Sequence, residues 1–374
     1  MRNKLLEQKN VYDFDGTREM FLNAVRETVA WHIEHNEFYR NLLKVRNFFP
    51  KRIKTEDDLS ELPLIHANFF KKHELLSVPR KDIVVHVTSS GTSGQKSQMF
   101  FDAPSWEFGE TMIRSILDYF GFVSNEPTNY ILYTYEPSEG NILGTAKTDQ
   151  GLLKYAPQNK VRYALRFNGI GHDFDSYGII ETFLDYEKEG LPVRIFGFPS
   201  FLYFTLQQMK SMKIKPLKLN KNSMTLLGGG WKGHTDKQIS KTELYALAEE
   251  MLGIPQCRCR DGYGSTEHSV PYFECSHHNF HVPIYSRMFV RDFKTLKPLG
   301  YGEIGFASFV TPHLLSVPAI SVLMGDKAVM YKGSKCGCGI DAPYMEILGR
   351  AGRSTVKSCA ISASELLKKQ RGNL

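Results

Sequence analysis

Strand-like and helix-like segments alternate through the middle of this 374-residue sequence, and that alternation constrains the fold more than any other feature. The apolar strand-like runs lie at 130–135, 193–196 and 224–227. The helical stretches lie at 106–120, 179–188, 201–210 and 237–252. Strands that alternate with helices form βαβ units, whose parallel strands need helices on both faces of the sheet. The sequence therefore predicts an α/β fold with a mostly parallel sheet flanked by helices.

Two flanking regions differ from this middle part. From Thr17 to about Val45 apolar residues recur at spacings of three and four, which predicts an amphipathic helix packed on a larger body. From Phe273 to about Met330 the apolar runs shorten and become β-rich. We therefore expect a helical N-terminal region at 1–84, a core at 85–348 and a short C-terminal tail at 349–374. A smaller β-rich part lies inside the core at 270–345.

Charge and hydropathy exclude several classes of protein. The 47 Lys and Arg residues outnumber the 40 Asp and Glu residues only slightly and are spread along the chain, so nucleic acid is not an expected partner. No segment approaches the ~20 apolar residues of a membrane span, and the polar N-terminus does not resemble a signal peptide. We expect a cytoplasmic protein without stable membrane insertion, in which six cysteines indicate metal binding or thiol chemistry before disulfides.

A loop rich in serine, threonine and glycine follows a strand that we expect to be buried at 81–88. Its candidate phosphate-binding residues are Thr88, Ser89, Ser90, Gly91, Thr92, Ser93, Gly94 and Lys96. Backbone N–H groups and short hydroxyls in such a loop suit a polyphosphate, and a lysine adds a positive charge. The spacing is not that of the Walker loop, and a flexible surface turn is the alternative interpretation.

A second candidate element runs Tyr263-Gly264-Ser265-Thr266-Glu267. The aromatic ring suits a purine, the hydroxyls suit an α-phosphate, and the Glu267 carboxylate suits a magnesium ion held between phosphates. Taken alone, the segment is also compatible with an ordinary loop.

Two shorter elements complete the pattern. Gly228, Gly229 and Gly230 end a predicted strand and allow close approach of a ligand or another backbone. Asp326 follows a glycine and is suited to accept hydrogen bonds from a ribose diol. The order and separation of these elements make a shared role in nucleotide binding the favoured hypothesis.

Together these motifs resemble the acyl-adenylate-forming superfamily, in which Gly349-Arg350 is similar to the hinge, so the resemblance adds Arg350 to the nucleotide site. A closer resemblance is to the LuxE-type acyl-protein synthetases, the long-chain fatty acid:protein ligases. It rests on the loop at 88–97, the run from Gly228 to Lys232 and the tail around Cys359. The resemblance implies that superfamily's large-domain fold with a truncated C-terminal small domain, and ATP and Mg²⁺ as cofactors.

The resemblance also implies a two-step reaction. A fatty acid attacks ATP to give acyl-AMP and pyrophosphate, and the acyl group then moves to Cys359 as a thioester. An acyl reductase partner of the LuxC type would take the acyl group onward. The alternatives are a CoA ligase of the phenylacetate type and a non-catalytic acyl- or nucleotide-binding partner.

The truncated tail lacks the lysine that the small domain of the superfamily supplies. Lys96 and Lys232 are the candidate replacements, and Thr266 with Glu267 completes the set of candidate catalytic groups around the α-phosphate. Lys232 is equally compatible with a surface position.

A metal site is expected from Cys275, His281, Cys336 and Cys338. Three thiolates and one imidazole can complete a tetrahedral zinc sphere of structural type, and phenylacetate-CoA-ligase-like enzymes are similar here. Reduced, unligated cysteines are the alternative, and His277 and His278 are the alternative histidines. The second Cys-x-Cys pair, Cys257 and Cys259, is interpreted as part of a core strand.

The densest aromatic run lies between the phosphate loop and the glycine run, where the superfamily has its acyl-binding segment. Its candidate acyl-binding residues are Phe196, Phe198, Pro199 and Phe201. Aromatic walls suit an alkyl chain, since each buried methylene contributes ~0.8 kcal/mol. Core aromatics at the start of a helix are the alternative.

Overall fold

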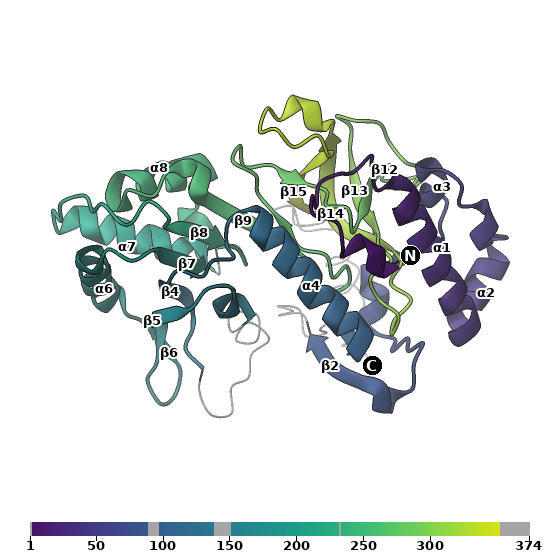
Figure 1. Cartoon of the computed structure of the whole chain (residues 1–374), viewed down its shortest axis with the longest axis horizontal. Coiled ribbons are helices and arrows are strands. Elements are labelled where there is room, and N and C mark those ends of the chain that lie inside the picture. The colour runs from purple at the N-terminus through teal and green to yellow at the C-terminus, as the bar shows by residue number, and fades with distance from the viewer. Residues whose placement is uncertain (1, 89–96, 138–150, 232, 352–374) are drawn as a thin grey trace, which may run out of the picture.

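The computed structural model describes residues 2–88, 97–137, 151–231 and 233–351. Figure 1 shows two halves side by side, one built on β4 to β9 with α6, α7 and α8, and the other on β12 to β15 with α1, α2 and α3. The long helix α4 lies between them. Short 3-10 turns lie at Arg2–Leu5, Pro50–Arg52, Ala67–Lys71, Arg80–Asp82, Leu153–Tyr155, Thr235–Lys237, Gln256–Arg258 and Gly333–Lys335.

The first half contains a seven-stranded sheet in the order β10-β9-β8-β7-β4-β5-β6. Its strands are β4 (Thr128–Tyr135), β5 (Gln158–Phe167), β6 (His172–Phe174), β7 (Val193–Gly197), β8 (Met224–Leu227), β9 (Cys259–Tyr263) and β10 (Tyr272–Phe273). The five central strands, β9, β8, β7, β4 and β5, are parallel to one another. The edge strands β6 and β10 are antiparallel to their neighbours. The predicted α/β fold with a mostly parallel sheet is confirmed.

Three helices cover one face of this sheet: α6 (Ser176–Glu189), α7 (Pro199–Ser211) and α8 (Lys241–Leu252). The expected helix at 237–252 begins only at Lys241, because the Ser240 side chain accepts a hydrogen bond from the Glu243 N–H and caps the helix there. On the opposite face of the sheet, Phe196 packs with Phe122, which lies just beyond the end of α4 (Ala103–Tyr119).

No apolar run in the sequence predicts β5 or β6. Most side chains of β5 are exposed or half-buried, and only Ala164 and Leu165 are buried. Without a continuous apolar run, a strand at this place has no clear period in the sequence.

The second half contains a six-stranded sheet in the order β11-β15-β14-β13-β12, with β1 paired parallel to β14. Its strands are β1 (Ile65–His66), β11 (Phe280–His281), β12 (Arg287–Arg291), β13 (Ile304–Val310), β14 (Ser321–Tyr331) and β15 (Tyr344–Arg350). The expected β-rich region is therefore present between the parallel sheet and the C-terminal tail.

A two-stranded ribbon of β2 (Ile83–Thr88) and β3 (Gln98–Asp102) carries the serine-rich loop between its ends. The strand β2 forms where it is expected, but the expectation that it is buried is wrong. Its residues alternate between half-buried and exposed, and Val84 is 57% exposed. A two-stranded antiparallel ribbon with one covered face produces this alternation.

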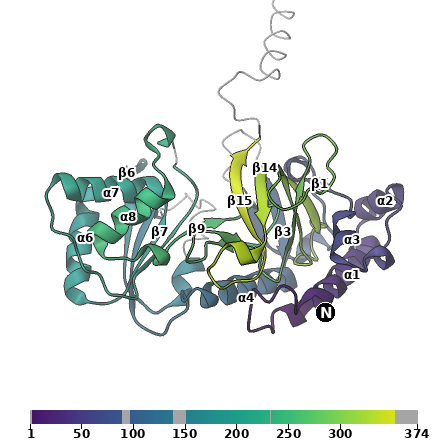
Figure 2. The same cartoon turned by 90° about the horizontal axis from the view of Figure 1, so that it is seen from above.

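The N-terminal region forms α1 (Arg18–His35), α2 (Glu37–Val45) and α3 (Glu56–Ser60). The single helix expected from Thr17 to Val45 is interrupted at Asn36, whose side chain accepts a hydrogen bond from Tyr39 N–H and caps α2. Figure 2 shows these helices on the side of the six-stranded sheet that is far from the parallel sheet. No helix among the described residues is both long and apolar enough to cross a membrane.

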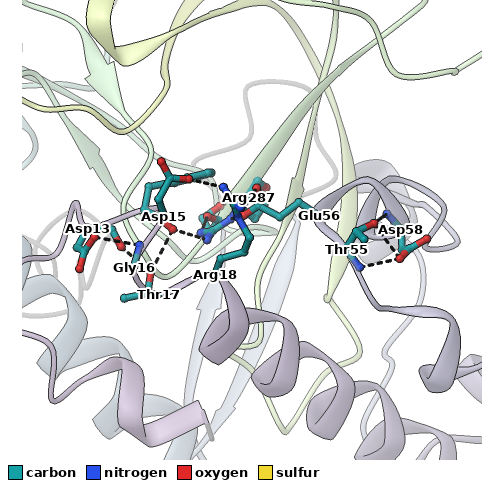
Figure 3. Close-up of polar contacts among 11 residues, drawn as sticks. Asp13, Asp15, Gly16, Thr17, Arg18, Thr55, Glu56, Asp58 and Arg287 are labelled. Carbon is teal, nitrogen blue, oxygen red and sulfur yellow. Dashed lines mark hydrogen bonds and ion pairs between the residues drawn. The ribbon is translucent and has the colours of Figure 1, made fainter.

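Arg287 of β12 joins the N-terminal region to the six-stranded sheet. Its Nε donates to Glu56 Oε1 at 2.5 Å, and its Nη2 donates to the backbone oxygen of Phe14 at 3.1 Å. The guanidinium also lies 4.3 Å from the ring centroid of Phe21. In Figure 3 the Arg287 side chain lies between residues 13–17 and Glu56. Nε and Nη2 therefore find their partners in segments far away in the sequence, while Nη1 donates to the backbone oxygen of the adjacent Ser286 at 2.9 Å.

Candidate active site

One end of the serine-rich loop lies beside the Tyr263–Glu267 segment. Ser97 Oγ donates a hydrogen bond to Glu267 Oε1, and both residues are buried. Thr88, at the other end of the loop, pairs with Gln98 in the ribbon. Residues 89–96 lie outside the described residues, and Ser97, which follows them, contacts the candidate magnesium ligand Glu267.

Tyr263, Asp326 and Arg350 also meet. The Tyr263 hydroxyl donates to Asp326 Oδ2 at 3.1 Å, and Arg350 Nε lies 3.6 Å from Asp326 Oδ1. Burial, and secondly the Asp326 charge, raises the pKa of Tyr263, so the hydroxyl stays protonated as a donor. Three residues that the sequence assigns to nucleotide binding therefore form one contact group between β9, β14 and β15.

The rest of the segment from Gly264 to Glu267 is held against β14. Ser265 Oγ accepts a hydrogen bond from the His268 N–H at 3.1 Å and lies 3.9 Å from Met324 Sδ. The Thr266 carbonyl accepts a hydrogen bond from Ser269 Oγ at 3.4 Å. A Cβ on Gly264 would meet open space, so this position faces room for a ligand.

The glycine run lies at the carboxyl ends of the parallel strands. Gly228 N–H donates to the Gly197 carbonyl at 3.0 Å, which joins the ends of β8 and β7. Gly229 and Gly230 have φ values of 75° and 70°, a left-handed conformation that glycine adopts without strain. Ligands of open α/β sheets bind at this edge, where strands end and backbone N–H groups are available.

A cavity of about 200 Å³ opens beside the glycine run. Its apolar walls come from Pro199, Leu227, Trp231 and Leu244, and Gly230 lies at its margin. Sequence analysis included Trp231 only as the residue after the glycines and missed Leu244, because nothing in the α8 sequence distinguishes a cavity-facing leucine from a core one.

The four candidate acyl-binding residues separate in the structure. Pro199 lines the 200 Å³ cavity, whereas the Phe201 ring packs 4.9 Å from that of Phe174. The Phe198 ring lies 5.8 Å from that of Tyr135. Phe196 is directed to the other face of the sheet, into the core with Phe122 and Tyr130. The structure therefore brings only Pro199 to this cavity. Phe196 faces away because alternate residues of a strand face opposite sides of the sheet, whereas the Phe198 and Phe201 rings pack against other aromatic rings.

Lys241 is a further charged residue that the sequence analysis missed at the cavity. Its Nζ lies 2.7 Å from Asp261 Oδ2 and 2.8 Å from Glu274 Oε1. Burial lowers the pKa of Lys241, but the two carboxylates outweigh burial, and the pKa is raised. Tyr245 donates to Glu274 Oε2 at 2.8 Å, so the fully buried Glu274 is satisfied on both oxygens.

Nine predicted catalytic or binding residues fall in parts of the chain that the structure does not describe. Lys96, Lys232 and Cys359 lie outside the described residues, as do Ser89, Ser90, Gly91, Thr92, Ser93 and Gly94. The described part of the site therefore defines the nucleotide edge and the cavity but not the cation or the thiol.

The predicted metal ligands Cys275, His281, Cys336 and Cys338 form one cluster, with their ligand atoms all within 4.8 Å of one another. Cys275 Sγ lies 3.5 Å from Cys336 Sγ, and Cys338 Sγ lies 3.2 Å from His281 Nε2. Ligands of a tetrahedral zinc ion, at about 2.3 Å from the metal, lie roughly 3.8 Å apart. The donor set and its spacing therefore fit zinc.

The surroundings of this cluster orient its ligands. His281 Nδ1 contacts the Ala342 carbonyl at 2.6 Å, which leaves Nε2 to face the sulfurs. Asn279 Nδ2 donates to Cys336 Sγ at 3.1 Å, and the His277 N–H donates to Cys275 Sγ at 3.3 Å. Donors of this kind stabilise thiolates, which are the forms of cysteine that bind metal.

The remaining pair of cysteines differs from the expectation that both belong to the core. Cys259 is buried, and burial raises its pKa to about 12. Cys257 is exposed, because β9 begins only at Cys259 and Cys257 lies in the preceding 3-10 turn. The expectation for Cys257 is therefore wrong.

The fold is shared with solved structures of a CoA ligase. An open conformation of 2-hydroxyisobutyryl-CoA ligase, solved with 2-HIB-AMP and CoA, is similar with a TM-score of 0.67 at 15% identity, over 94% of this chain and 79% of that chain. The same ligase in its postadenylation state with 2-HIB-AMP gives a TM-score of 0.66 over 92% of this chain and 70% of that chain.

Sequence comparison narrows the class. The profile of the family described as "Acyl-protein synthetase, LuxE" matches residues 9–368, and the chain belongs to this family. A long-chain-fatty-acid–luciferin-component ligase of Aliivibrio fischeri is 25% identical over 362 residues, which cover 96% of this chain and 91% of the relative. The ligase of the same name from Vibrio harveyi is 24% identical over 357 residues, 93% of this chain and 88% of the relative.

Proposed function

We propose that this protein activates a long-chain fatty acid with ATP and transfers the acyl group to its own Cys359. The observation that carries the proposal is the meeting of the phosphate-loop flank with Glu267 through Ser97, in a chain of the acyl-protein synthetase family. In the first step a carboxylate oxygen of the acid bonds to the α-phosphorus of ATP, and pyrophosphate leaves. In the second step the thiolate attacks the acyl carbon, and AMP leaves.

The nucleotide occupies the carboxyl edge of the parallel sheet in this proposal. Tyr263 stacks on the adenine and Asp326 accepts from the ribose diol, while Arg350 holds Asp326 from the opposite strand. Thr266 and the loop at 88–96 contact the phosphates, with Gly228 to Gly230 beside them. A magnesium ion held by Glu267 would neutralise charge on the phosphates.

The fatty acid enters the cavity beside the glycine run. Its apolar walls of Pro199, Leu227, Trp231 and Leu244 favour methylene groups, each of which contributes ~0.8 kcal/mol when buried. Lys241 is held by two carboxylates at this cavity, so Lys96 or Lys232 remains the proposed cation for the α-phosphate.

The thioester on Cys359 keeps the acyl group activated for an acyl reductase, the proposed partner. Attack by the reductase's own nucleophile or by hydride would release the Cys359 thiolate and allow another cycle. Cys359 lies outside the described residues, so its role rests on the sequence resemblance and the family.

Labelling with ATP and radioactive tetradecanoate tests the acceptor. We expect a hydroxylamine-sensitive label on the protein that is lost in Cys359→Ser and retained in Cys257→Ser, a matched change at an exposed thiol. Label that appears only on added CoA would instead identify a CoA ligase, the activity named for the structural neighbour. Absence of acid-dependent ATP–pyrophosphate exchange would identify a non-catalytic binding partner.

Glu267→Gln tests the nucleotide edge separately from the thiol. We expect at least a tenfold loss of ATP–pyrophosphate exchange, because removing one aligned charge costs a few kcal/mol in a buried site. Glu181→Gln, a change of the same kind on the exposed face of α6, should leave exchange unchanged. Full exchange in Glu267→Gln would remove Glu267 from the site.

We also propose that the cluster of Cys275, His281, Cys336 and Cys338 binds a structural zinc ion. Three cysteines and one histidine leave no open position for substrate on a four-coordinate ion. The cluster ties the turn at Cys336 and Cys338 to the segment that precedes β12, so the ion would stabilise this end of the six-stranded sheet.

A further inference from the structure

A second cavity, of about 400 Å³, lies at the amino ends of the strands of the seven-stranded sheet, opposite the ends that carry the glycine run. Its walls come from the amino ends of four strands: Thr128 of β4, Arg194 of β7, Met224 of β8 and Arg260 of β9. These strands run parallel, and their carboxyl ends carry the glycine run and the candidate active site. The cavity is therefore separate from that site.

Arg194 is the most unusual residue in this cavity. It is 3% exposed, and its Nη1 donates to the Tyr130 hydroxyl at 3.3 Å. Its Nε is buried without a hydrogen-bond partner, and no carboxylate of the described chain pairs with it. Buried guanidinium groups are normally paired, because an uncompensated buried charge loses its hydration without a gain in return. Arg194 therefore lacks a counter-charge.

Two more arginines face the same cavity. The Arg260 guanidinium lies 4.6 Å from the ring centroid of Phe120 and donates only to the backbone oxygen of Glu274. The Arg258 side chain, which also lines the cavity, forms no hydrogen bond or ion pair with the rest of the described chain. Glu126 is the one carboxylate in the lining, and it accepts a hydrogen bond from Asn222 Nδ2 at 3.1 Å. Positive charge therefore exceeds negative charge in the cavity.

The remaining lining suits a small polar molecule. Ser124, Thr128 and Ser276 offer hydroxyl groups, and the cavity has the volume of an ordinary ligand site. The planar fork of a guanidinium matches two oxygens of a phosphate, and several arginines around one anion are typical of phosphate recognition.

We propose that this arginine cavity, defined by Arg194, Arg258 and Arg260, is a second binding site that takes a phosphate-bearing small molecule. The phosphate supplies the counter-charge for the three guanidinium groups, and the hydroxyls of Ser124 and Ser276 hydrogen-bond its oxygens. The lining includes residues from the connection between α4 and β4, from the parallel sheet, and from the segment after Cys275. An occupant therefore contacts both halves of the molecule.

Cys257 provides a local reporter, since it is exposed and lines the arginine cavity. The full-length protein is alkylated with iodoacetamide with or without inorganic phosphate, at equal ionic strength set by chloride, and the Cys257 peptide is quantified by mass spectrometry. We expect phosphate to slow alkylation at least about threefold at twice its dissociation constant, because only the unoccupied fraction reacts. Citrate, a larger anion whose charge is on carboxylates, should protect much less.

Variants tie the protection to the arginines. Arg258→Met, which breaks no hydrogen bond or ion pair within the described chain, and Arg194→Met should each weaken phosphate binding. The phosphate concentration that gives half-maximal protection should rise at least about tenfold in each variant. Arg166→Met is the matched control, since Arg166 lies in the same sheet but does not line the cavity. Its Nε pairs with Glu136 Oε2 at a distance of 2.9 Å. Equal protection in Arg258→Met and wild type, or equal protection by chloride, citrate and phosphate, would overturn the proposal. Phosphate binding that leaves Cys257 alkylation unchanged would place the anion elsewhere and also overturn it.

Discussion

Arg287 and Arg194 are buried to nearly the same extent, 2% and 3% exposed, but their surroundings differ. Arg287 has the Glu56 carboxylate as a counter-charge and backbone oxygens for its other donors. Arg194 has a neutral phenol as its hydrogen-bonding partner among the described residues. The half with the six-stranded sheet therefore compensates its buried arginine within the chain, whereas the half with the seven-stranded sheet does not.

Other features follow the same division. The six-stranded half contains the metal cluster and three buried histidines, at His32, His268 and His313. The two cavities and the glycine run lie at the two edges of the seven-stranded sheet. We therefore expect stability to be concentrated in the six-stranded half, whereas both cavities lie at the strand ends of the seven-stranded sheet.

Loss of the metal should give the largest effect, confined at first to the six-stranded half. We expect Cys336→Ser to lose zinc and to lower the free energy of unfolding by an amount on the order of 5 kcal/mol, because metal binding contributes directly to folding. Metal analysis and urea unfolding measure the two effects. Hydrogen exchange should show faster opening in β11 and β15 than in β7 and β8.

Cys257→Ser is the matched control for this change, since Cys257 lies outside the metal cluster. Its zinc content and unfolding should equal those of the wild type. If Cys336→Ser keeps one zinc per chain, or if both halves open together, the division between a stabilising half and a ligand-binding half is wrong.

Acid should be the next largest perturbation, again of the six-stranded half. Burial lowers the pKa of His32 and His313 to about 4 and that of His268 to about 3, while the unfolded value is about 6.5. The folded pKa lies below the unfolded pKa, so this stability is complete above pH 6.5 and decreases as the pH falls toward 4. At pH 5.5 each histidine costs roughly 1.4 kcal/mol, about 4 kcal/mol together.

Urea unfolding at pH 7.5 and pH 5.5 measures this loss. His313→Gln should remove about a third of the pH dependence, since a Gln amide can still donate to the Ser105 carbonyl that His313 Nε2 contacts at 2.9 Å. Equal unfolding free energies at the two pH values would show that these histidines are protonated in the folded state.

Arg287→Met should have an intermediate effect. The change removes the shorter of the two ion pairs of Glu56, whose other partner Arg18 lies 3.6 Å away, and removes the link between β12 and the N-terminal segment, which costs about 3 kcal/mol. The double variant Arg287→Met with Glu56→Gln should be less destabilised than the sum of the two single variants, because no charge is left unpaired. Simple additivity in this cycle would mean that the ion pair contributes nothing.

The sequence predicted the elements that carry a local signal. The strands β4, β7 and β8 and their covering helices follow from apolar periodicity, and the four metal ligands follow from residue type together with the family resemblance. The half-exposed β5 and the break at Asn36 were missed, because in both places hydrogen bonding and capping override the apolar pattern.

The nucleotide edge could be proposed from motifs, but the arginine cavity could not. Arg194, Arg258 and Arg260 belong to no motif, and 63 residues of sequence separate the first two. The parallel order β7-β8-β9 brings them together, and sequence alone does not fix strand order. Burial of Arg194 without a carboxylate is a property of the folded chain only.

Arg194→Met should have the smallest effect on stability and therefore tests the comparison most directly. Replacing a buried arginine that has no counter-charge with an apolar side chain of similar length removes an unfavourable desolvation and one weak hydrogen bond, so the net change in unfolding free energy should lie within about 1 kcal/mol of zero. The measurement is urea unfolding in chloride buffer without phosphate, beside Arg287→Met. Added phosphate should then stabilise the wild type more than the Arg194→Met variant. A loss as large as that of Arg287→Met would show that the chain itself compensates Arg194, and the two halves would then not differ.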